Sequence, residues 1–178
     1  MIQIRQGIFE TNSSSVHAIC ISKKPYVLPE KIVFNACEYG WEDNKRKLPD
    51  YLYTALIEFE DTQKLEHMKK LIESLGVECV YRKPKVIHSE WGDYYDCGID
   101  HSINLCDFIS SVFSDDDLLL RCLFSDGSYV HTGNDNSDTC PNEADEYIEE
   151  YDQDADEWVR KPNPNHKPDK FDYFEKGN

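Results

Sequence analysis

Negative charge is concentrated in one stretch of this 178-residue chain. This charge limits which parts of a fold the stretch can occupy. Eleven carboxylates and no Lys or Arg occur between Asp135 and Glu157. Residues 101–178 hold 19 acidic and 6 basic residues, so most of the net charge of −16 lies there. Such a stretch must stay solvated or meet a basic partner, because unpaired charges are costly to bury. The excess also repels phosphates, so we expect no direct binding to nucleic acid or to an anionic membrane.

The pattern of apolar residues predicts an α+β fold with a mixed, mostly antiparallel sheet and three or four helices. Residues 2–22 match an N-terminal β-hairpin, in which Ile2, Ile4 and Ile8 alternate with polar residues and 16–21 is the return strand. Further expected elements are strands at 31–34, 77–81 and 129–132, helices from residue 49, over 62–75 and after residue 102, and an irregular segment at 83–100.

Residues 115–132 allow two interpretations. Asp115, Asp116 and Asp117 precede three leucines, which predicts a fourth helix because acidic residues in a first turn complement the helix dipole. The Asp-Gly pair at 126–127 is also a strong turn signal, so residues 118–132 allow a hairpin instead. We favour the helix.

The length of the chain fits one domain, which we place at residues 1–140. Residues 141–178 are expected to form an acidic helix or extended C-terminal segment that is packed on this domain or appended to it. Within that segment we expect a helix over about 142–151, a linker at 161–165 and an aromatic patch at 171–174.

Seven cysteines occur at irregular spacings, and an odd number is unusual for a secreted disulfide framework. We therefore expect reduced thiols. Residues 1–7 contain no apolar segment typical of a signal peptide, and no apolar run approaches the roughly 20 residues that span a bilayer. These features predict a cytoplasmic protein, and no motif indicates a cofactor.

Residues 5–17 contain the most distinctive combination of polar side chains in the chain. In one interpretation they form the site of a small hydrolase or transferase, with His17 as base, Glu10 orienting it and a serine as nucleophile. In another they contact a ligand or partner, and in a third they only stabilise a turn by bonding to nearby backbone. The candidate catalytic residues are Glu10, Ser13, Ser14, Ser15 and His17, and the candidate contact residues are Arg5, Thr11 and Asn12.

Residues 5–17 also resemble part of a known group of proteins. The segment Arg5-x-Gly-x-Phe-Glu-Thr-Asn-Ser-Ser-Ser-x-His17, together with residues 99–101 and 132–136, resembles a group of short, largely uncharacterised proteins of bacteria and their phages. Small acidic proteins of this mobile-element type include inhibitors of host defence, among them some anti-CRISPR proteins. The resemblance implies an inhibitor and supplies no catalytic residues.

Two stretches have the composition of metal sites without the required spacing. Residues 88–101 contain seven potential ligands, but no compact pair of soft ligands such as Cys-x2-Cys, so a polar surface loop is favoured over a zinc site. Residues 152–156 begin like a calcium-binding EF-hand loop, but Glu157 and Asn163 stand where that loop needs Gly and Glu. We expect no metal. The potential ligands in the first stretch are His88, Glu90, Asp93, Asp96, Cys97, Asp100 and His101.

The acidic stretch is the best candidate for a binding surface. On a helix its carboxylates would form rows about 5–6 Å apart, similar to the spacing of nucleic-acid phosphates, with aromatic residues between them. The sequence thus favours an acidic inhibitor of phage or mobile-element type that docks on a basic nucleic-acid-binding protein, such as a CRISPR or other defence nuclease. The alternatives are the small enzyme and an accessory protein with an ordinary acidic surface. The expected partner-binding residues are Glu143, Glu146, Tyr147, Glu149, Glu150, Tyr151, Asp152, Asp154, Asp156 and Trp158.

Overall fold

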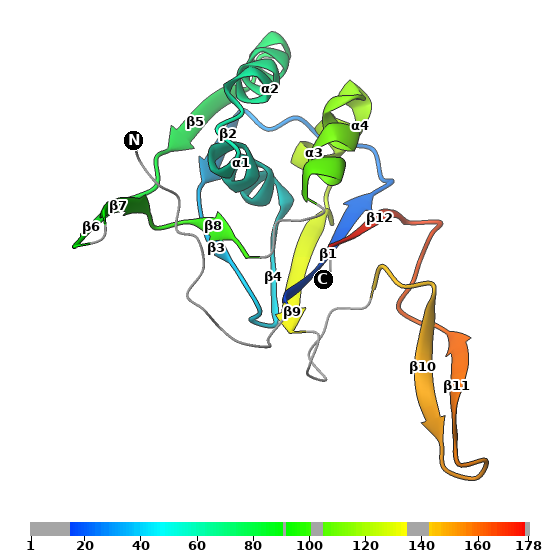
Figure 1. The fold of residues 1–178 in the computed structure, drawn as a ribbon. Helices are drawn as coiled ribbons and strands as arrows, with labels where there is room; N and C mark the ends of the chain where they lie inside the picture. The colour runs from blue at the N-terminus through cyan, green and yellow to red at the C-terminus, as the bar shows by residue number, and fades with distance from the viewer. Residues whose placement is uncertain (1–14, 91, 101–104, 135–142, 177–178) are drawn as a thin grey trace.

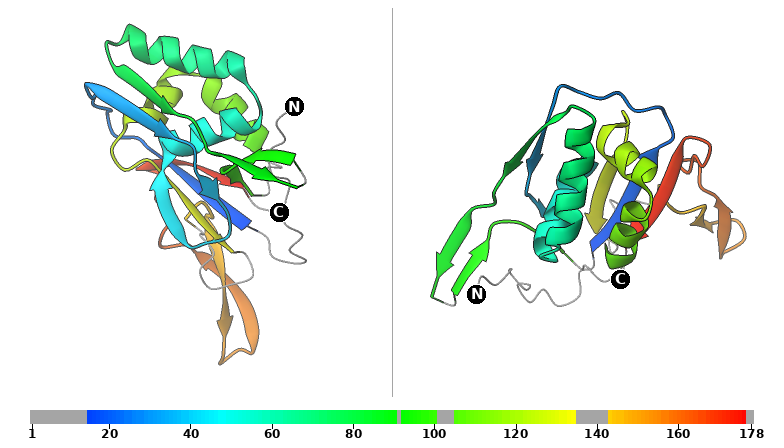
Figure 2. Two further views of the ribbon diagram at one scale, coloured as in Figure 1. Left: turned by 90° about the vertical axis from the view of Figure 1, so that its left-hand side faces the viewer. Right: turned by 90° about the horizontal axis from the view of Figure 1, so that it is seen from above.

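A computed structural model describes residues 15–90, 92–100, 105–134 and 143–176 of the chain. Within these residues the protein is an α+β fold with four helices and mostly antiparallel strand pairs, as the sequence predicts. The helices lie together beside a central sheet, and one long hairpin projects away from them (Figures 1 and 2). None of the described helices is both long and apolar enough to cross a membrane.

Four strands form the central sheet. They are β1 (Ser15–Ser22), β4 (Asn44–Lys47), β9 (Tyr129–Asn134) and β12 (Phe171–Lys176). Their order is β12-β1-β9-β4, and all neighbours run antiparallel. Every residue of β1 is buried because the strand is paired on both sides. A strand at 16–21 is therefore confirmed, but its partners on the two sides are β9 and β12, so it is not paired as the return strand of the predicted N-terminal hairpin. The other strand of that predicted hairpin lies outside the described residues.

The helices begin and end where local sequence signals place them. Pro49 lies in the first turn of α1, and the Asp61 side chain accepts a hydrogen bond from the Lys64 backbone N–H at the start of α2. Gly76 follows α2 with φ +79°, a conformation that favours glycine. Asp115 caps α4, so the helical interpretation of this region is correct and the hairpin alternative is wrong. The helices are α1 (Leu48–Glu58), α2 (Thr62–Ser74), α3 (Leu105–Phe113) and α4 (Asp116–Phe124).

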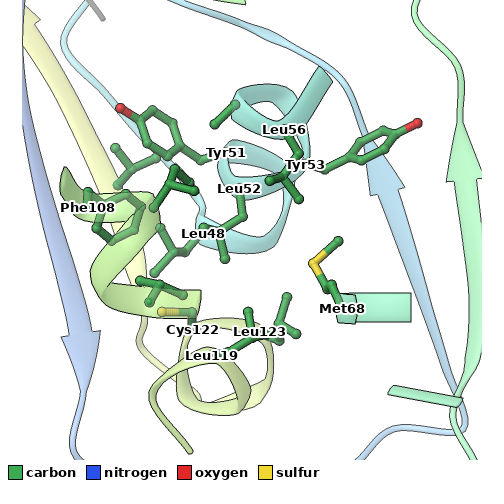
Figure 3. Close-up of a cluster of buried hydrophobic side chains, with 14 of the residues drawn as sticks. Leu48, Tyr51, Leu52, Tyr53, Leu56, Met68, Phe108, Leu119, Cys122 and Leu123 are labelled. Carbon is green, nitrogen blue, oxygen red and sulfur yellow. The ribbon is translucent and has the colours of Figure 1, made fainter. Parts of the chain in front are cut away.

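The hydrophobic core lies between the helices and the inner face of the central sheet (Figure 3). Leu48 and Leu52 of α1 are fully buried in it, as is Met68 of α2. Ile19 and Ile21 of β1 supply the sheet side of this core. The core thus joins residues that are far apart in the sequence and fixes β1 in place.

The segment from 83 to 100 is more regular than expected. It contains β6 (Val86–Ser89), β7 (Gly92–Tyr95) and β8 (Gly98–Ile99), so the prediction of an irregular segment is wrong. β6 and β7 pair antiparallel around a tight turn, in which Gly92 adopts φ +120°. Two other pairs are parallel: β2 (Lys31–Asn35) with β5 (Glu78–Arg82), and β3 (Glu38–Tyr39) with β8.

The C-terminal third differs most from the expectation. The predicted acidic helix is wrong, because this region forms an antiparallel hairpin of β10 (Tyr147–Asp152) and β11 (Glu157–Pro162). A helix would place like charges four residues apart, whereas the strand places Glu150 and Asp152 on the face opposite Tyr147 and Tyr151. Lys161 and Pro162 belong to β11 and are not a linker. The aromatic patch at 171–174 lies in β12, which pairs with β1 in the central sheet.

Candidate functional site: the C-terminal hairpin

The two faces of the hairpin carry different chemistry, and the strand register decides which residue lies on which face. Tyr151 lies directly opposite Trp158, and Glu149 lies opposite Arg160. Directly opposed residues of an antiparallel pair share a face, as do residues two positions apart on one strand. Tyr147, Tyr151 and Trp158 therefore all lie on one face, together with Arg160. We call Tyr147, Tyr151, Trp158 and Arg160 the aromatic face.

The aromatic face is exposed and internally ordered. The exposed fractions of Tyr147, Tyr151 and Trp158 are 41%, 42% and 69%. The rings of Tyr151 and Trp158 meet edge to face with centroids 5.4 Å apart, and the guanidinium carbon of Arg160 lies 4.4 Å from the centre of the Tyr147 ring. Tyr, Trp and Arg are the residue types most enriched among the energetically dominant residues of protein interfaces.

The carboxylates lie mainly on the opposite face and at the tip. Glu150, Asp152 and Glu157 occupy the opposite face, where Lys161 Nζ lies 3.1 Å from Glu150 Oε2. At the tip, Asp152 Oδ1 accepts hydrogen bonds from two backbone N–H groups, and the Tyr151 hydroxyl donates to Asp156. The predicted rows of carboxylates on a helix are therefore wrong. In the strands Glu150, Asp152 and Glu157 lie on the face opposite the aromatic residues, and Glu149 lies between Tyr147 and Tyr151 on the aromatic face.

Asn163 closes the base of the hairpin. Its backbone N–H donates to the Glu146 carbonyl oxygen at 3.0 Å, and its Nδ2 donates to the Asp145 carbonyl oxygen at 2.8 Å. Only 5% of Asn163 is exposed. The next turn is held by His166, whose ring stacks on Tyr173 of β12 with centroids 4.6 Å apart. The Asn163 bonds join the two strands at the base of the hairpin, and the His166–Tyr173 stack joins this base to the central sheet.

Glu143 was expected to meet a partner, but its carboxylate is used within the protein. The side chain is 13% exposed, and Oε1 lies 2.9 Å from both Lys45 Nζ and His131 Nδ1. Burial alone raises the pKa of Glu143, but the hydrogen bonds from Lys45 and His131 outweigh it and hold the pKa below its ordinary value. The Glu143 carboxylate is therefore paired with Lys45 and His131 where the hairpin leaves the sheet.

The charge of the hairpin is strongly negative. Residues 145–162 contain eight carboxylates and two basic side chains, which gives a net charge of −6. A field of this sign accelerates encounter with a basic surface and opposes the approach of another acidic one. The remaining expected binding residues, from Glu146 to Trp158, do lie on or beside this hairpin.

The alternative catalytic residues that the structure describes lie in the core. His17 is fully buried on β1, and its Nδ1 lies 3.0 Å from the hydroxyl oxygen of Tyr51, which is also fully buried. The Ser15 hydroxyl donates to the Asp100 carbonyl oxygen at 3.3 Å. A base with its ring enclosed in a core does not meet a dissolved substrate, so this geometry favours a structural role. The other candidates, Arg5, Glu10, Thr11, Asn12, Ser13 and Ser14, lie outside the described residues.

The stretch considered for metal binding is spread over separate elements. His88 Nδ1 lies 2.7 Å from Asp93 Oδ1 on the exposed β6–β7 hairpin. Cys97 is buried, and burial raises the pKa of its thiol to about 11. Within the part of the chain that the structure describes, no three His, Cys, Asp or Glu side chains converge as metal ligands; His101 lies outside that part.

Arg160, Lys161 and Asn163 were missed as site residues. A usable signal was present, because the β-favouring residues Tyr147, Ile148 and Tyr151 precede an acidic loop. The β-favouring residues Trp158 and Val159 follow that loop, which together is the pattern of a hairpin. No protein-family model, curated protein or solved structure matches this chain. The functional interpretation therefore depends on the chemistry of the hairpin itself.

Proposed function

We propose that this chain is a non-enzymatic inhibitor that docks its C-terminal hairpin on a basic, nucleic-acid-binding protein. One observation carries the proposal: Tyr147, Tyr151 and Trp158 gather with Arg160 on one exposed face of a projecting hairpin of net charge −6. Exposed aromatic residues supply binding energy on burial, and the surrounding carboxylates supply attraction to a basic partner.

The attachment of the hairpin supports this role. Asn163 and Glu143 hold its base through hydrogen bonds to the backbone and to the side chains of Lys45 and His131. A binding element that is already ordered loses less conformational entropy on association than a flexible tail. The hairpin is therefore suited to bind as a rigid element.

The charge indicates the class of partner. Surfaces that bind nucleic acid are rich in Lys and Arg, and they attract an acidic hairpin for the same reason that they attract phosphates. Docking there would exclude nucleic acid from the occupied surface. The resemblance of residues 5–17 to phage and bacterial proteins favours a nuclease of host defence, such as a CRISPR effector, as this partner.

Capture from a bacterial lysate at low and high salt tests the proposal. The immobilised wild-type chain should retain a basic nucleic-acid-binding protein at low salt and lose it as salt screens the attraction. The combined Tyr147→Ala, Tyr151→Ala and Trp158→Ala variant should lose it at both salt concentrations, because residues of this kind typically contribute about 2 kcal/mol or more each. Trp41→Ala is the matched control, since Trp41 is 45% exposed and lies outside the hairpin.

A competition assay separates inhibition from mere association. The captured protein should release labelled nucleic acid when the wild-type chain is added. Neutralising Glu146, Glu149, Glu150 and Asp152 together should weaken this competition and reduce its dependence on salt. Capture that is unaffected by both sets of hairpin substitutions would refute the proposed function.

A further inference from the structure

The outer half of the hairpin combines two aromatic rings with an excess of carboxylates. Residues 151–158 contain four carboxylates and no Lys or Arg. Tyr151 and Trp158 face each other across the two strands, and their ring planes meet at 64° with centroids 5.4 Å apart. Because 69% of Trp158 is exposed, most of this side chain is accessible to a ligand from solution.

Near the base of the hairpin, the aromatic face already holds one cationic side chain. There the guanidinium of Arg160 lies over the Tyr147 ring, with its central carbon 4.4 Å from the ring centre. The hairpin's other basic residue, Lys161, lies on the opposite face and pairs with Glu150. Both basic side chains of the hairpin therefore have partners near its base, whereas the charge at its tip is entirely negative.

We propose that Tyr151 and Trp158 form a binding site for the guanidinium group of an arginine side chain. The inference rests on the proposed function and sharpens it, because it names the chemical group of the partner that the hairpin binds. A cation is attracted to the electron-rich face of an aromatic ring, and tryptophan gives the strongest attraction. Arginine is favoured over lysine because its planar, weakly hydrated guanidinium stacks on rings and can donate two parallel hydrogen bonds to a carboxylate.

The tip supplies such carboxylates in a fixed arrangement. Asp152 holds the turn through bonds to the backbone N–H groups of Asp154 and Ala155. Asp156, at φ +57°, accepts a hydrogen bond from the Tyr151 hydroxyl, which couples the orientation of that ring to the tip. An arginine stacked on the aromatic pair would therefore lie beside the Asp156 carboxylate, which is held close to the Tyr151 ring.

Charge argues against two other occupants of this surface. A second copy of the chain would bring another hairpin of the same net charge of −6, and like charges oppose that contact. An anionic membrane surface is disfavoured for the same reason. A cationic side chain has the complementary charge and the geometry that aromatic rings bind.

Titration of the full chain with oligo-arginine and oligo-lysine peptides of equal length tests the proposal. The two peptides carry the same charge, so simple attraction to the acidic surface should bind both alike. We expect the arginine peptide to bind about two- to five-fold more tightly, as a single exposed cation–π contact predicts. Chemical-shift changes should centre on the Trp158 indole N–H.

Four variants make the result specific to the aromatic pair. Trp158→Ala should abolish the preference for arginine while leaving the salt-dependent binding of both peptides. Tyr151→Phe should keep the preference, because it retains the ring and removes only the hydroxyl, and Trp41→Ala should also keep it. Trp158→Phe is the control for a loss of hairpin structure, since it preserves an aromatic ring at this position. It should retain part of the preference for arginine.

Equal binding of the two peptides by the wild-type chain would overturn the arginine site. That result would leave the proposed function intact if the triple hairpin variant still lost its partner from lysate. Conversely, an arginine preference that requires Trp158, together with capture unaffected by the hairpin substitutions, would support the site and refute the proposed function. The two hypotheses therefore fail separately.

Discussion

His131 Nδ1 donates a hydrogen bond to Glu143 Oε1 at 2.9 Å, and this contact joins the base of the C-terminal hairpin to β9 of the central sheet. The other ring nitrogen of His131 lies 2.6 Å from Asp43 Oδ1. Lys45 Nζ approaches the same Glu143 carboxylate at 2.9 Å. Residues from three separate parts of the chain thus meet where the hairpin leaves the sheet.

Glu143→Gln should lower the free energy of unfolding at neutral pH. The substitution keeps the shape of the side chain but removes the charge that Lys45 and His131 approach. Hydrogen bonds to charged groups contribute about 1.5–3 kcal/mol, and we expect a loss in this range. Urea unfolding at pH 7 measures it, with Glu146→Gln as control because the Glu146 side chain is exposed. Equal stability of the two variants would contradict this assignment.

The stabilisation by Glu143 should disappear in acid. Its pKa in the folded state is depressed below the ordinary value of 4.5, so the folded state favours the ionised carboxylate more than the unfolded state does. A depressed carboxyl pKa contributes stability above the unfolded value, and this contribution is lost as the pH falls through the folded value. The difference in unfolding free energy between wild type and Glu143→Gln should therefore shrink steadily below pH 4.5. A constant difference across this range would exclude the linkage.

Asn163→Ala should loosen the hairpin without unfolding the central sheet. The change removes the donor to the Asp145 carbonyl oxygen and the acceptor for the Asn165 backbone N–H. Leaving such groups unpaired costs about 1–3 kcal/mol. Hydrogen exchange should quicken in β10 and β11 while β1 and β9 stay protected, and Asn165→Ala should leave both regions unchanged because its side chain is exposed. Uniform acceleration across the protein would argue against a local role.

Tyr51→Phe tests the structural role of the buried His17. It preserves the ring in the core and removes only the hydroxyl that lies 3.0 Å from His17 Nδ1. Losing one partner of a buried hydrogen bond should cost about 1–3 kcal/mol, seen as a lower midpoint of thermal unfolding. Tyr26→Phe is the control, since Tyr26 is only partly buried and packs on Phe124 near the surface. An unchanged midpoint for Tyr51→Phe would reopen a functional role for His17.

The cysteines should differ sharply in reactivity. Cys106 is exposed on α3, whereas burial raises the pKa of Cys20 and of Cys97 to about 11. At pH 8 only about one in a thousand of such thiols is ionised, and the thiolate is the reactive form. Alkylation of the native protein, followed by peptide mass spectrometry, should modify Cys106 well before Cys20 and Cys97. Simultaneous labelling would show that the core opens readily.

Local signals were sufficient for most of the helical layer. Pro49 and Asp61 lie at the starts of α1 and α2, and Gly76 adopts the φ of +79° expected after a helix. These features act over a few residues, so the sequence alone places them well. The β6–β7 hairpin at 86–95 was missed, because short strands without a continuous apolar stripe give a weak periodic signal.

The sequence by itself determined where the charge lies, that the segments now seen as α1 to α4 are helical, and that 16–21 is a strand. Only the tertiary structure decided that the acidic stretch is a hairpin, because strand pairing joins Tyr151 to Trp158 across a turn, and local periodicity does not record that contact. It also decided that Glu143 faces inward, since Lys45 and His131, which stabilise its charge, are distant in the sequence and approach it only when the chain is folded. The pairing of β12 with β1 was also decided by the tertiary structure. These strands lie at the two ends of the described chain, so they meet only when the segments between them are folded and packed.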